Sequence, residues 1–365
     1  MNQLFRWDQT GLFLLALAAG ILPEVCAAAL REGLTLCSGP LLLSLFPFLV
    51  VSRLLIQCPE SDLLALPFRL AAWGIGIRTP CAARVLCIGF LGGFAPAASA
   101  AAQAVRTGQL TAEEADALLP ACICSGPSFV VLTVGQSLLG SAELGVLLFA
   151  SQITANYLTA ALLNRFAGVR SVKPGSAAPA SPAPPRLDEI LADAAITYCK
   201  LCGFILFFRM LAAGAGALLP AGAGTLCAVL LEVCSGCDLA SRTGRWGSLL
   251  CCAALSVQGL SVLLQVRTIC PPEMTLRPLY RARLLHLPLS LALFYLLLPG
   301  GEADVFSTLP ARVLLMRRVP PDCALLVFAV CCMAACTLRS GIRQVEQKQM
   351  ARNAGGCCIN SKTLL

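Results

Sequence analysis

Long apolar runs with few charges constrain the fold of this chain more than any other feature. Hydrophobic residues make up 58% of the 365 positions and charged residues only 13%, and the mean hydropathy is +0.80. Soluble domains carry about 25% charged residues. In lipid every backbone polar group must be bonded within the protein, so an apolar run that crosses the bilayer folds as a helix. Runs of this length predict an all-α integral membrane protein.

Eight of the runs are long enough to be spanning helices, and two more are broken by small residues. The predicted spanning helices lie at about 10–30, 40–58, 117–139, 143–164, 195–218, 247–267, 284–299 and 320–338. The stretches 84–107 and 221–240 are rich in Gly, Ala, Ser and Pro. Broken backbone is tolerated at membrane depth only where it is buried in protein or lines a cavity, so both stretches predict re-entrant hairpins. The segment 61–79 is expected at the membrane interface.

Basic residues set the orientation of the two halves. Arginine and lysine gather in the Pro/Ala-rich linker and in the tail, so these stretches and both termini are expected in the cytoplasm. Each half then reads as a helix, a hairpin and a further helix, in opposite orientations, which is an inverted repeat. The predicted parts are an N-terminal helix (1–38), a first repeat (39–166), the linker (167–190), a second repeat (191–300), a C-terminal transmembrane region (301–338) and a basic tail (339–365).

An arginine occurs in the same apolar setting in each half. Arg53 follows the sequence Phe48-Leu-Val-Val-Ser, and Arg209 follows Phe204-Ile-Leu-Phe-Phe. A charge inside lipid is costly and usually faces a polar cavity, and matched features in two halves of a membrane protein point to a transport site. The two arginines are therefore candidate substrate-binding residues, with snorkelling to the interface as the structural alternative.

Small and polar residues interrupt the apolar stretches at corresponding places in the two halves. A Gly or Pro at a helix break frees backbone groups, and the N-terminal end of a half-helix attracts anions. Glu232, in an apolar run, is the candidate for binding a coupling proton or sodium ion, and Asn156 is a second candidate for ion coupling. Each Gly or Ser can equally serve helix packing. The candidates for substrate binding at the breaks are Gly93, Pro96, Ser125, Ser128, Ser235, Gln258, Ser261 and Gln265.

The 21 cysteines and the single histidine form no metal or catalytic pattern. The cysteines are scattered through apolar runs, where a thiol behaves as a small hydrophobe. His286 is interpreted as a structural residue in a loop at a membrane edge, and no Ser/His arrangement supplies a nucleophile and a base. The net charge of +8 comes with no basic patch interleaved with aromatics. We expect no enzymatic activity, no cofactor, no metal and no nucleic-acid partner.

Five ordered segments resemble a known family. Three of them resemble the first nucleoside-recognition (gate) domain of a sporulation integral membrane protein family: Gly92-Gly-Phe-Ala-Pro96, Leu110-Thr-Ala-Glu-Glu-Ala115 and Cys124-Ser-Gly-Pro-Ser-Phe129. Two resemble its second gate domain: Leu231-Glu-Val-Cys-Ser-Gly236 and Gln258-Gly-Leu-Ser-Val-Leu-Leu-Gln265. The resemblance covers roughly residues 40–300. The chain departs from the family pattern at 257–259, where Val-Gln-Gly stands in place of Phe-Gly-Gly.

The resemblance carries expectations about function. The family occurs in endospore-forming Firmicutes and is distantly similar to concentrative nucleoside transporters. It implies a secondary transporter in the bacterial cell membrane or the outer forespore membrane that moves dipicolinic acid. Dipicolinate is a planar dianion, and two arginines could each bind one carboxylate. The alternatives are a nucleoside or nucleobase carrier, which would bind neutral ligands without the arginines, and a sporulation scaffold that transports nothing. The sequence leaves the coupling ion and any oligomer open.

Overall fold

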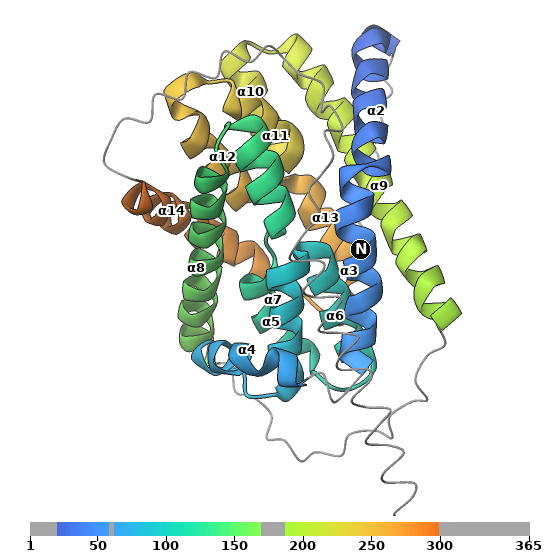
Figure 1. Cartoon of the computed structure of the whole chain (residues 1–365), viewed down its shortest axis with the longest axis vertical. Helices are drawn as coiled ribbons and strands as arrows, with labels where there is room; N and C mark the ends of the chain where they lie inside the picture. Colours follow the sequence, from blue (N-terminus) through green and yellow to red (C-terminus); the bar gives the residue numbers. More distant parts are fainter. Residues whose placement is uncertain (1–19, 58–61, 169–186, 299–365) are drawn as a thin grey trace, which may run out of the picture.

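The protein is built from helices that pack side by side into a bundle (Figure 1). The structure is a computed structural model and describes residues 20–57, 62–168 and 187–298, in which every regular element is a helix. The helices of the first half are α2 (Pro23–Ser38), α3 (Pro40–Gln57), α4 (Asp62–Gly74), α5 (Pro80–Gly92), α6 (Phe94–Arg106), α7 (Ala112–Cys122), the π-helix η2 (Ser128–Leu138) and α8 (Ala142–Ala167).

The second half begins after the linker. Its helices are α9 (Leu187–Leu218), α10 (Ala221–Leu231), α11 (Val233–Ser241), the short 3-10 helix η3 (Gly244–Trp246), α12 (Gly247–Val257), α13 (Gly259–Ile269) and α14 (Arg277–Leu297). Helix α9 therefore starts inside the predicted linker 167–190, which corrects the predicted boundary. The start of the first predicted helix, most of the linker, the helix at 320–338 and the tail lie outside the described residues.

Four helical segments in the described residues are long and apolar enough to cross a membrane: Pro23–Leu43 (α2 and the start of α3), Ala142–Ala167 (α8), Leu187–Leu218 (α9) and Gly244–Ile269 (η3, α12 and α13). Helices of this length and composition are typical of integral membrane proteins. The all-α class predicted from the sequence agrees with these elements.

Two predicted helices are interrupted, at the places where small and polar residues predict helix breaks. The run 117–139 is divided into α7 and η2 by a non-helical segment at 123–126. Pro127 disfavours helical backbone in the residue before it and lacks an N–H, so the helix stops ahead of it. The run 247–267 is divided into α12 and α13 at Gln258, whose φ is 65°. A left-handed φ at a residue other than glycine ends regular α-helix.

The two Gly/Ala-rich stretches each fold as a pair of short helices. Helices α5 and α6 meet at Gly93 and pack against each other, and α10 and α11 meet at Glu232 and do the same. In each half such a pair is followed by a broken helix: α7 and η2 in the first half, and α12 and α13 in the second. The same order of parts therefore occurs twice.

Close glycine contacts hold η2 against α8. A Cβ added at Gly135 would lie 2.5 Å from the Cα of Gly145, so the two backbones are too near for any side chain at that point. Small residues allow this approach between helices in a membrane. The contact fixes the second part of the first broken helix on the long helix α8.

A buried carboxylate ties the first half to the segment that leads into α14. Asp116, in α7, accepts hydrogen bonds from the backbone N–H of Thr275 at 2.8 Å, its hydroxyl at 2.6 Å and the N–H of Leu276 at 3.1 Å. Leu276 has a φ of 57°, so this turn needs outside support.

We therefore predict that Asp116→Asn destabilises the purified protein. The amide keeps one acceptor oxygen but places an NH2 group against backbone donors, which should cost about 2–3 kcal/mol. A thermal unfolding curve in detergent checks this. The control is Asp238→Asn, because Asp238 forms an exposed ion pair with Arg242 within one helix, and such pairs contribute about 0–1 kcal/mol. Equal unfolding temperatures for the two variants would contradict the role given to Asp116.

Candidate functional site

The turn of the first hairpin lies against the break in the following helix. Gly93 joins α5 to α6 with a φ of 81°. A Cβ at this position would lie 2.7 Å from the backbone N of Gly126 and 3.2 Å from the carbonyl oxygen of Cys124. Glycine is required here both for the backbone conformation and for the space. Gly93 and the segment Cys124-Ser-Gly-Pro are therefore in contact. This contact is expected if the breaks of the first half form one site.

The second half repeats this contact. Glu232 joins α10 to α11, and a Cβ added at Gly259 would lie 3.0 Å from the backbone N of Glu232. Gly259 has a φ of 68° and begins α13, directly after the break at Gln258. Each hairpin turn thus touches the break of the helix that follows it.

A hydrogen bond connects the two breaks. The amide Nε2 of Gln258 donates to the hydroxyl of Ser125 at 3.3 Å and to the carbonyl oxygen of Leu255 at 2.6 Å. Both side chains are buried. Gln258 holds a left-handed backbone conformation that favours glycine, and such residues cluster at functional sites. Two predicted site residues from opposite halves of the chain are therefore in contact.

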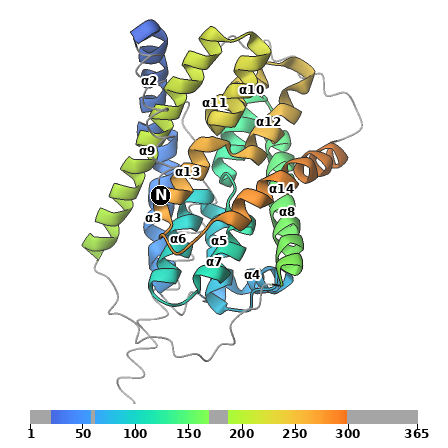
Figure 2. The same cartoon turned by 180° about the vertical axis from the view of Figure 1, so that it is seen from behind.

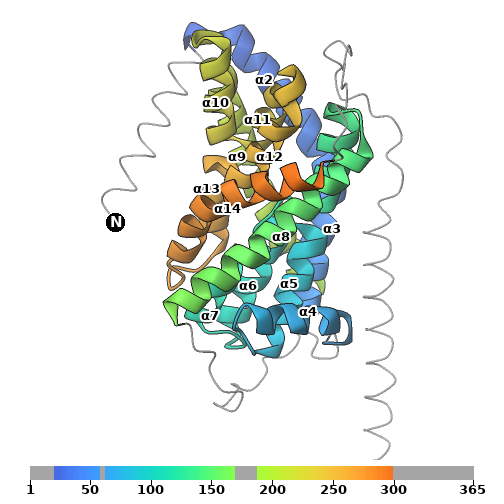
Figure 3. The ribbon, with the colours of Figure 1, turned by 90° about the vertical axis from the view of Figure 1, so that its left-hand side faces the viewer.

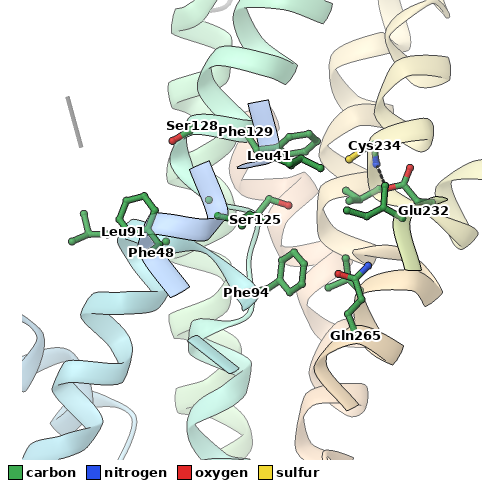
Figure 4. Close-up of a pocket in the computed structure, with 16 residues that line it drawn as sticks. Leu41, Phe48, Leu91, Phe94, Ser125, Ser128, Phe129, Glu232, Cys234 and Gln265 are labelled. Carbon is green, nitrogen blue, oxygen red and sulfur yellow. Dashed lines mark hydrogen bonds between the residues drawn. The ribbon is translucent and has the colours of Figure 1, made fainter. Parts of the chain in front are cut away.

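A pocket lies where the two hairpin turns and the two breaks come together (Figure 4). The empty space between its lining residues, open solvent included, is about 620 Å³. Three phenylalanines (Phe48, Phe94 and Phe129) line its apolar part. The polar lining is Ser125, Ser128, Glu232 and Gln265, and the other lining residues are Leu41, Leu45, Leu91, Gly92, Gly126, Ile205, Val233, Cys234 and Val262.

Gln265 lines this pocket and carries a buried acceptor oxygen. Its Nε2 donates to the hydroxyl of Ser261 at 2.8 Å, one helical turn away, while its Oε1 has no hydrogen-bond partner among the described residues. The oxygen lies on the side of the amide that faces Phe94 (Figure 4). Gln265 is 1% exposed, and a buried acceptor without a partner is costly unless a ligand or water supplies a donor.

The N-terminal ends of the two hairpin helices differ. The carboxylate of Glu232 caps α11, accepting from the N–H of Cys234 at 2.8 Å and of Ser235 at 2.6 Å. Helix α6 begins at Phe94 without a side-chain cap. The positive end of α11 is therefore neutralised by a carboxylate of the protein, whereas the corresponding end of α6 faces the pocket at Phe94.

The two arginines are placed differently from the clamp predicted from the sequence. Arg53 pairs with Asp193 at 2.6 Å, and Arg209 pairs with Glu32 at 2.8 Å. Neither arginine lines the pocket. Each guanidinium is bound by a carboxylate from another segment, and the substrate clamp stays a prediction.

These ion pairs join helix α9 to helices α2 and α3, which run antiparallel to it. Helix α9 runs along α2 and α3, and the long contact is visible from behind (Figure 2). Glu32 lies in α2 and Arg53 in α3, whereas Asp193 and Arg209 both lie in α9. The hydroxyl of Tyr198 donates to the carbonyl oxygen of Cys37 between the two pairs. Arg53 and Arg209 thus have the same role: each forms an ion pair between α9 and the helices α2 and α3.

Six other predicted residues are not among the lining residues of the pocket: Gly93 and Gln258, which form the turn and the break described above, Ser261, which accepts a hydrogen bond from Gln265, and Pro96, Ser235 and Asn156. Pro96 packs under the first hairpin turn, where its ring would meet a Cβ at Gly92 at 3.0 Å. Ser235 contributes its backbone N–H to Glu232. Asn156, in α8, donates to the carbonyl oxygen of Ile123 at 3.4 Å, so it lies behind the first break.

Sequence reasoning missed the aromatic lining and misplaced the histidine. Phe94 and Phe129 each follow a predicted site residue directly, and this adjacency was the available signal. His286 lies in α14 and is 1% exposed, not in a loop. Its Nε2 donates to the carbonyl oxygen of Gln152 at 3.2 Å, so its Nδ1 accepts from the hydroxyl of Ser256 at 2.5 Å.

The cysteines in the described part of the chain are all free thiols, including Cys234 and Cys237, which are separated by only two residues. Most of these cysteines are buried, and Cys234 lines the pocket. Within the same residues no three side chains of His, Cys, Asp or Glu are grouped as a metal site.

The site belongs to a helical membrane protein in which two hairpin turns meet two helix breaks around one small pocket. Comparisons of the chain with protein-family models, with curated proteins and with solved structures gave no significant match.

Proposed function

We propose that the protein is a secondary transporter whose substrate binds in the pocket between the hairpin turns and the helix breaks. The observation that carries this proposal is that residues from both halves line one pocket, at Gly92, Ser125, Glu232 and Gln265. Irregular backbone at membrane depth and paired interruptions in two halves are hallmarks of transporter sites. In this proposal the chain has eight spanning helices, its two hairpins are re-entrant, and its halves form an inverted repeat with both termini in the cytoplasm.

The lining favours a planar, uncharged substrate with hydrogen-bond donors. Phenylalanine rings offer faces for stacking, Gln265 offers a free acceptor oxygen, and Ser125 and Ser128 offer hydroxyls. Among the described residues no basic side chain lines the pocket, and Glu232 brings a carboxylate, which disfavours a dianion. A nucleobase or nucleoside combines these properties, so we place this class first.

Dipicolinate is the second candidate, and one observation supports it. The uncapped N-terminal ends of α6 and η2, at Phe94 and Ser128, both border the pocket. Helix N-termini bind carboxylates through their backbone N–H groups. An anion bound there would lie opposite Glu232 without any arginine. This candidate keeps the sporulation role and the outer forespore membrane that the family resemblance implies.

Uptake by the purified protein in liposomes tests the proposal. Radiolabelled uridine, adenine and dipicolinate would be offered separately, with protein-free liposomes as the baseline. We expect uptake of uridine or adenine above that of dipicolinate. Preference for dipicolinate would reverse the order of the two candidates. No uptake of a broad set of metabolites by folded protein would favour a scaffold that transports nothing.

The arginines provide a second test, because the pocket does not include them. We predict that Arg53→Gln and Arg209→Gln bind substrate with a Kd within about three-fold of the wild type, since the contribution of partly exposed ion pairs is about 0–1 kcal/mol. Isothermal titration with the transported compound measures this. Asp193→Asn and Glu32→Gln serve as matched variants, because they break the same ion pairs from the other side. Loss of binding in the arginine variants alone would restore the clamp.

A further inference from the structure

Arg283 lies behind the pocket, where three helices meet. Helix α14 packs against α7, α8 and α12, and it crosses α8 in the side view (Figure 3). Arg283 is 8% exposed. Its guanidinium donates to the carbonyl oxygen of Ile123 at 2.5 Å and to that of Ser256 at 3.3 Å.

Both acceptors belong to the ends of half-helices. Ile123 is the C-terminal cap of α7, directly before the first break, and Ser256 is in the last turn of α12, directly before the second. The C-terminal end of a helix carries a partial charge of roughly −0.5, so two such ends present about one negative charge. One guanidinium supplies one positive charge to both.

The charge of Arg283 has no carboxylate beside it in the described structure. Both of its hydrogen bonds go to carbonyl oxygens, its Nε has no partner, and none of the ion pairs of the described residues includes it. Burying an unpaired charge costs several kcal/mol. The two helix ends are therefore the groups that compensate it.

An amide side chain adjoins one of these two acceptors. Besides the two carbonyls, Asn156 is bonded to Ile123 and has a buried Oδ1 without a partner among the described residues. Carbonyl groups of unwound segments and half-helix C-terminal ends coordinate the coupling cation in many transporters with broken helices. Here an arginine side chain occupies the same electrostatic position at both breaks at once.

We propose that Arg283 is a built-in cation of the paired helix breaks, taking the place at which a coupling Na⁺ would bind. The folded site is then complete without Na⁺, and substrate movement does not depend on a Na⁺ gradient. Arg283 is a positioning residue, because it holds the ends of α7 and α12 rather than the substrate. The statement about transport rests on the proposed function, whereas the statement about ion binding does not.

The test measures thermal stability without substrate, in NaCl and in choline chloride at equal ionic strength. The wild type should unfold at the same temperature in both salts. Arg283→Ser leaves the carbonyl oxygens and Asn156 around an empty space. In choline chloride this variant should unfold about 5 °C lower than the wild type or more. NaCl, or millimolar guanidinium added to choline chloride, should restore at least half of that difference.

Two variants make the result specific. Arg281→Ser removes an exposed arginine from the same helix and should respond to neither salt nor guanidinium. Arg283→Lys keeps the charge and should stay insensitive to Na⁺. If Arg283→Ser cannot be purified, the wild type and Arg283→Lys in the two salts still decide the question, because Na⁺-dependent stability in either would overturn the proposal. Rescue by neither cation in Arg283→Ser would overturn it as well.

The proposal fails separately from the transport function. Wild-type uptake with and without a Na⁺ gradient should be equal, and a requirement for the gradient would overturn the role of Arg283 while leaving a transporter. Absence of uptake of every compound would overturn the transport function while leaving the ion-binding result intact.

Discussion

Replacing Gly93 with alanine is expected to reduce uptake at least about ten-fold. The added Cβ would lie 2.7 Å from the backbone N of Gly126, and alanine would have to hold a φ of 81°. Each effect costs about 1–3 kcal/mol. Because backbone rather than a flexible side chain is in the way, the hairpin turn and the helix break must separate.

A matched glycine separates this effect from the general effect of adding a methyl group. Gly203, in α9, has no atom within 4 Å of an added Cβ. Gly203→Ala should leave uptake and unfolding temperature within error of the wild type. Uptake rates in liposomes, scaled to the amount of folded protein, compare the two variants. Normal uptake by Gly93→Ala would show that the turn and the break need not touch, and the proposed site would lose its foundation.

Glu232→Gln is expected to reduce uptake by a similar factor for an electrostatic reason. The carboxylate accepts two short hydrogen bonds from the N-terminal end of α11, and hydrogen bonds to charged groups are worth about 1.5–3 kcal/mol each. The glutamine amide keeps one acceptor but turns an NH2 group toward the second N–H. The variant also removes the only acidic side chain of the pocket lining.

The control for Glu232 is an acidic residue in the first turn of another helix. Glu143 lies exposed at the start of α8, whose cap is the hydroxyl of Ser141. Glu143→Gln should behave as the wild type.

The hypothesis that Glu232 binds a coupling proton predicts a further result. Uptake by the wild type should rise with an imposed proton gradient, and residual uptake by Glu232→Gln should not. A gradient response that survives in Glu232→Gln would assign coupling to another group.

The broken stretches could be predicted from sequence because their cause is local. Gly, Ala, Ser and Pro in 84–107 and 221–240 weaken a continuous helix, and the structure divides both stretches, at Gly93 and at Glu232. Pro127 gives an equally local reason for the break after α7. The break at Gln258 is also predicted, but the left-handed conformation of this glutamine has no local signal. Its amide donates to Leu255 at 2.6 Å and to Ser125, which is distant in sequence, at 3.3 Å.

The roles of the charged residues could not be predicted because they depend on distant partners. Arg53 and Asp193 are 140 positions apart, and Arg209 and Glu32 are 177 apart. An apolar run around an arginine shows that the charge needs compensation, but it does not show whether a substrate or a carboxylate provides it. The same holds for Arg283, whose partners are backbone carbonyls with no signature in the sequence.

The most direct measurement compares uptake by the wild type with uptake by Gln265→Leu, using whichever labelled compound the wild type transports in liposomes. Gln265 touches the pocket with an acceptor oxygen that has no partner in the described structure, and leucine removes that acceptor without enlarging the side chain. Gln136→Leu, on an exposed position of η2, is the matched control. We predict that Gln265→Leu raises KM at least about ten-fold, as expected for a lost hydrogen bond in a buried site, while Gln136→Leu leaves it unchanged. An unchanged KM in Gln265→Leu would contradict the placement of the substrate between the hairpin turns and the helix breaks.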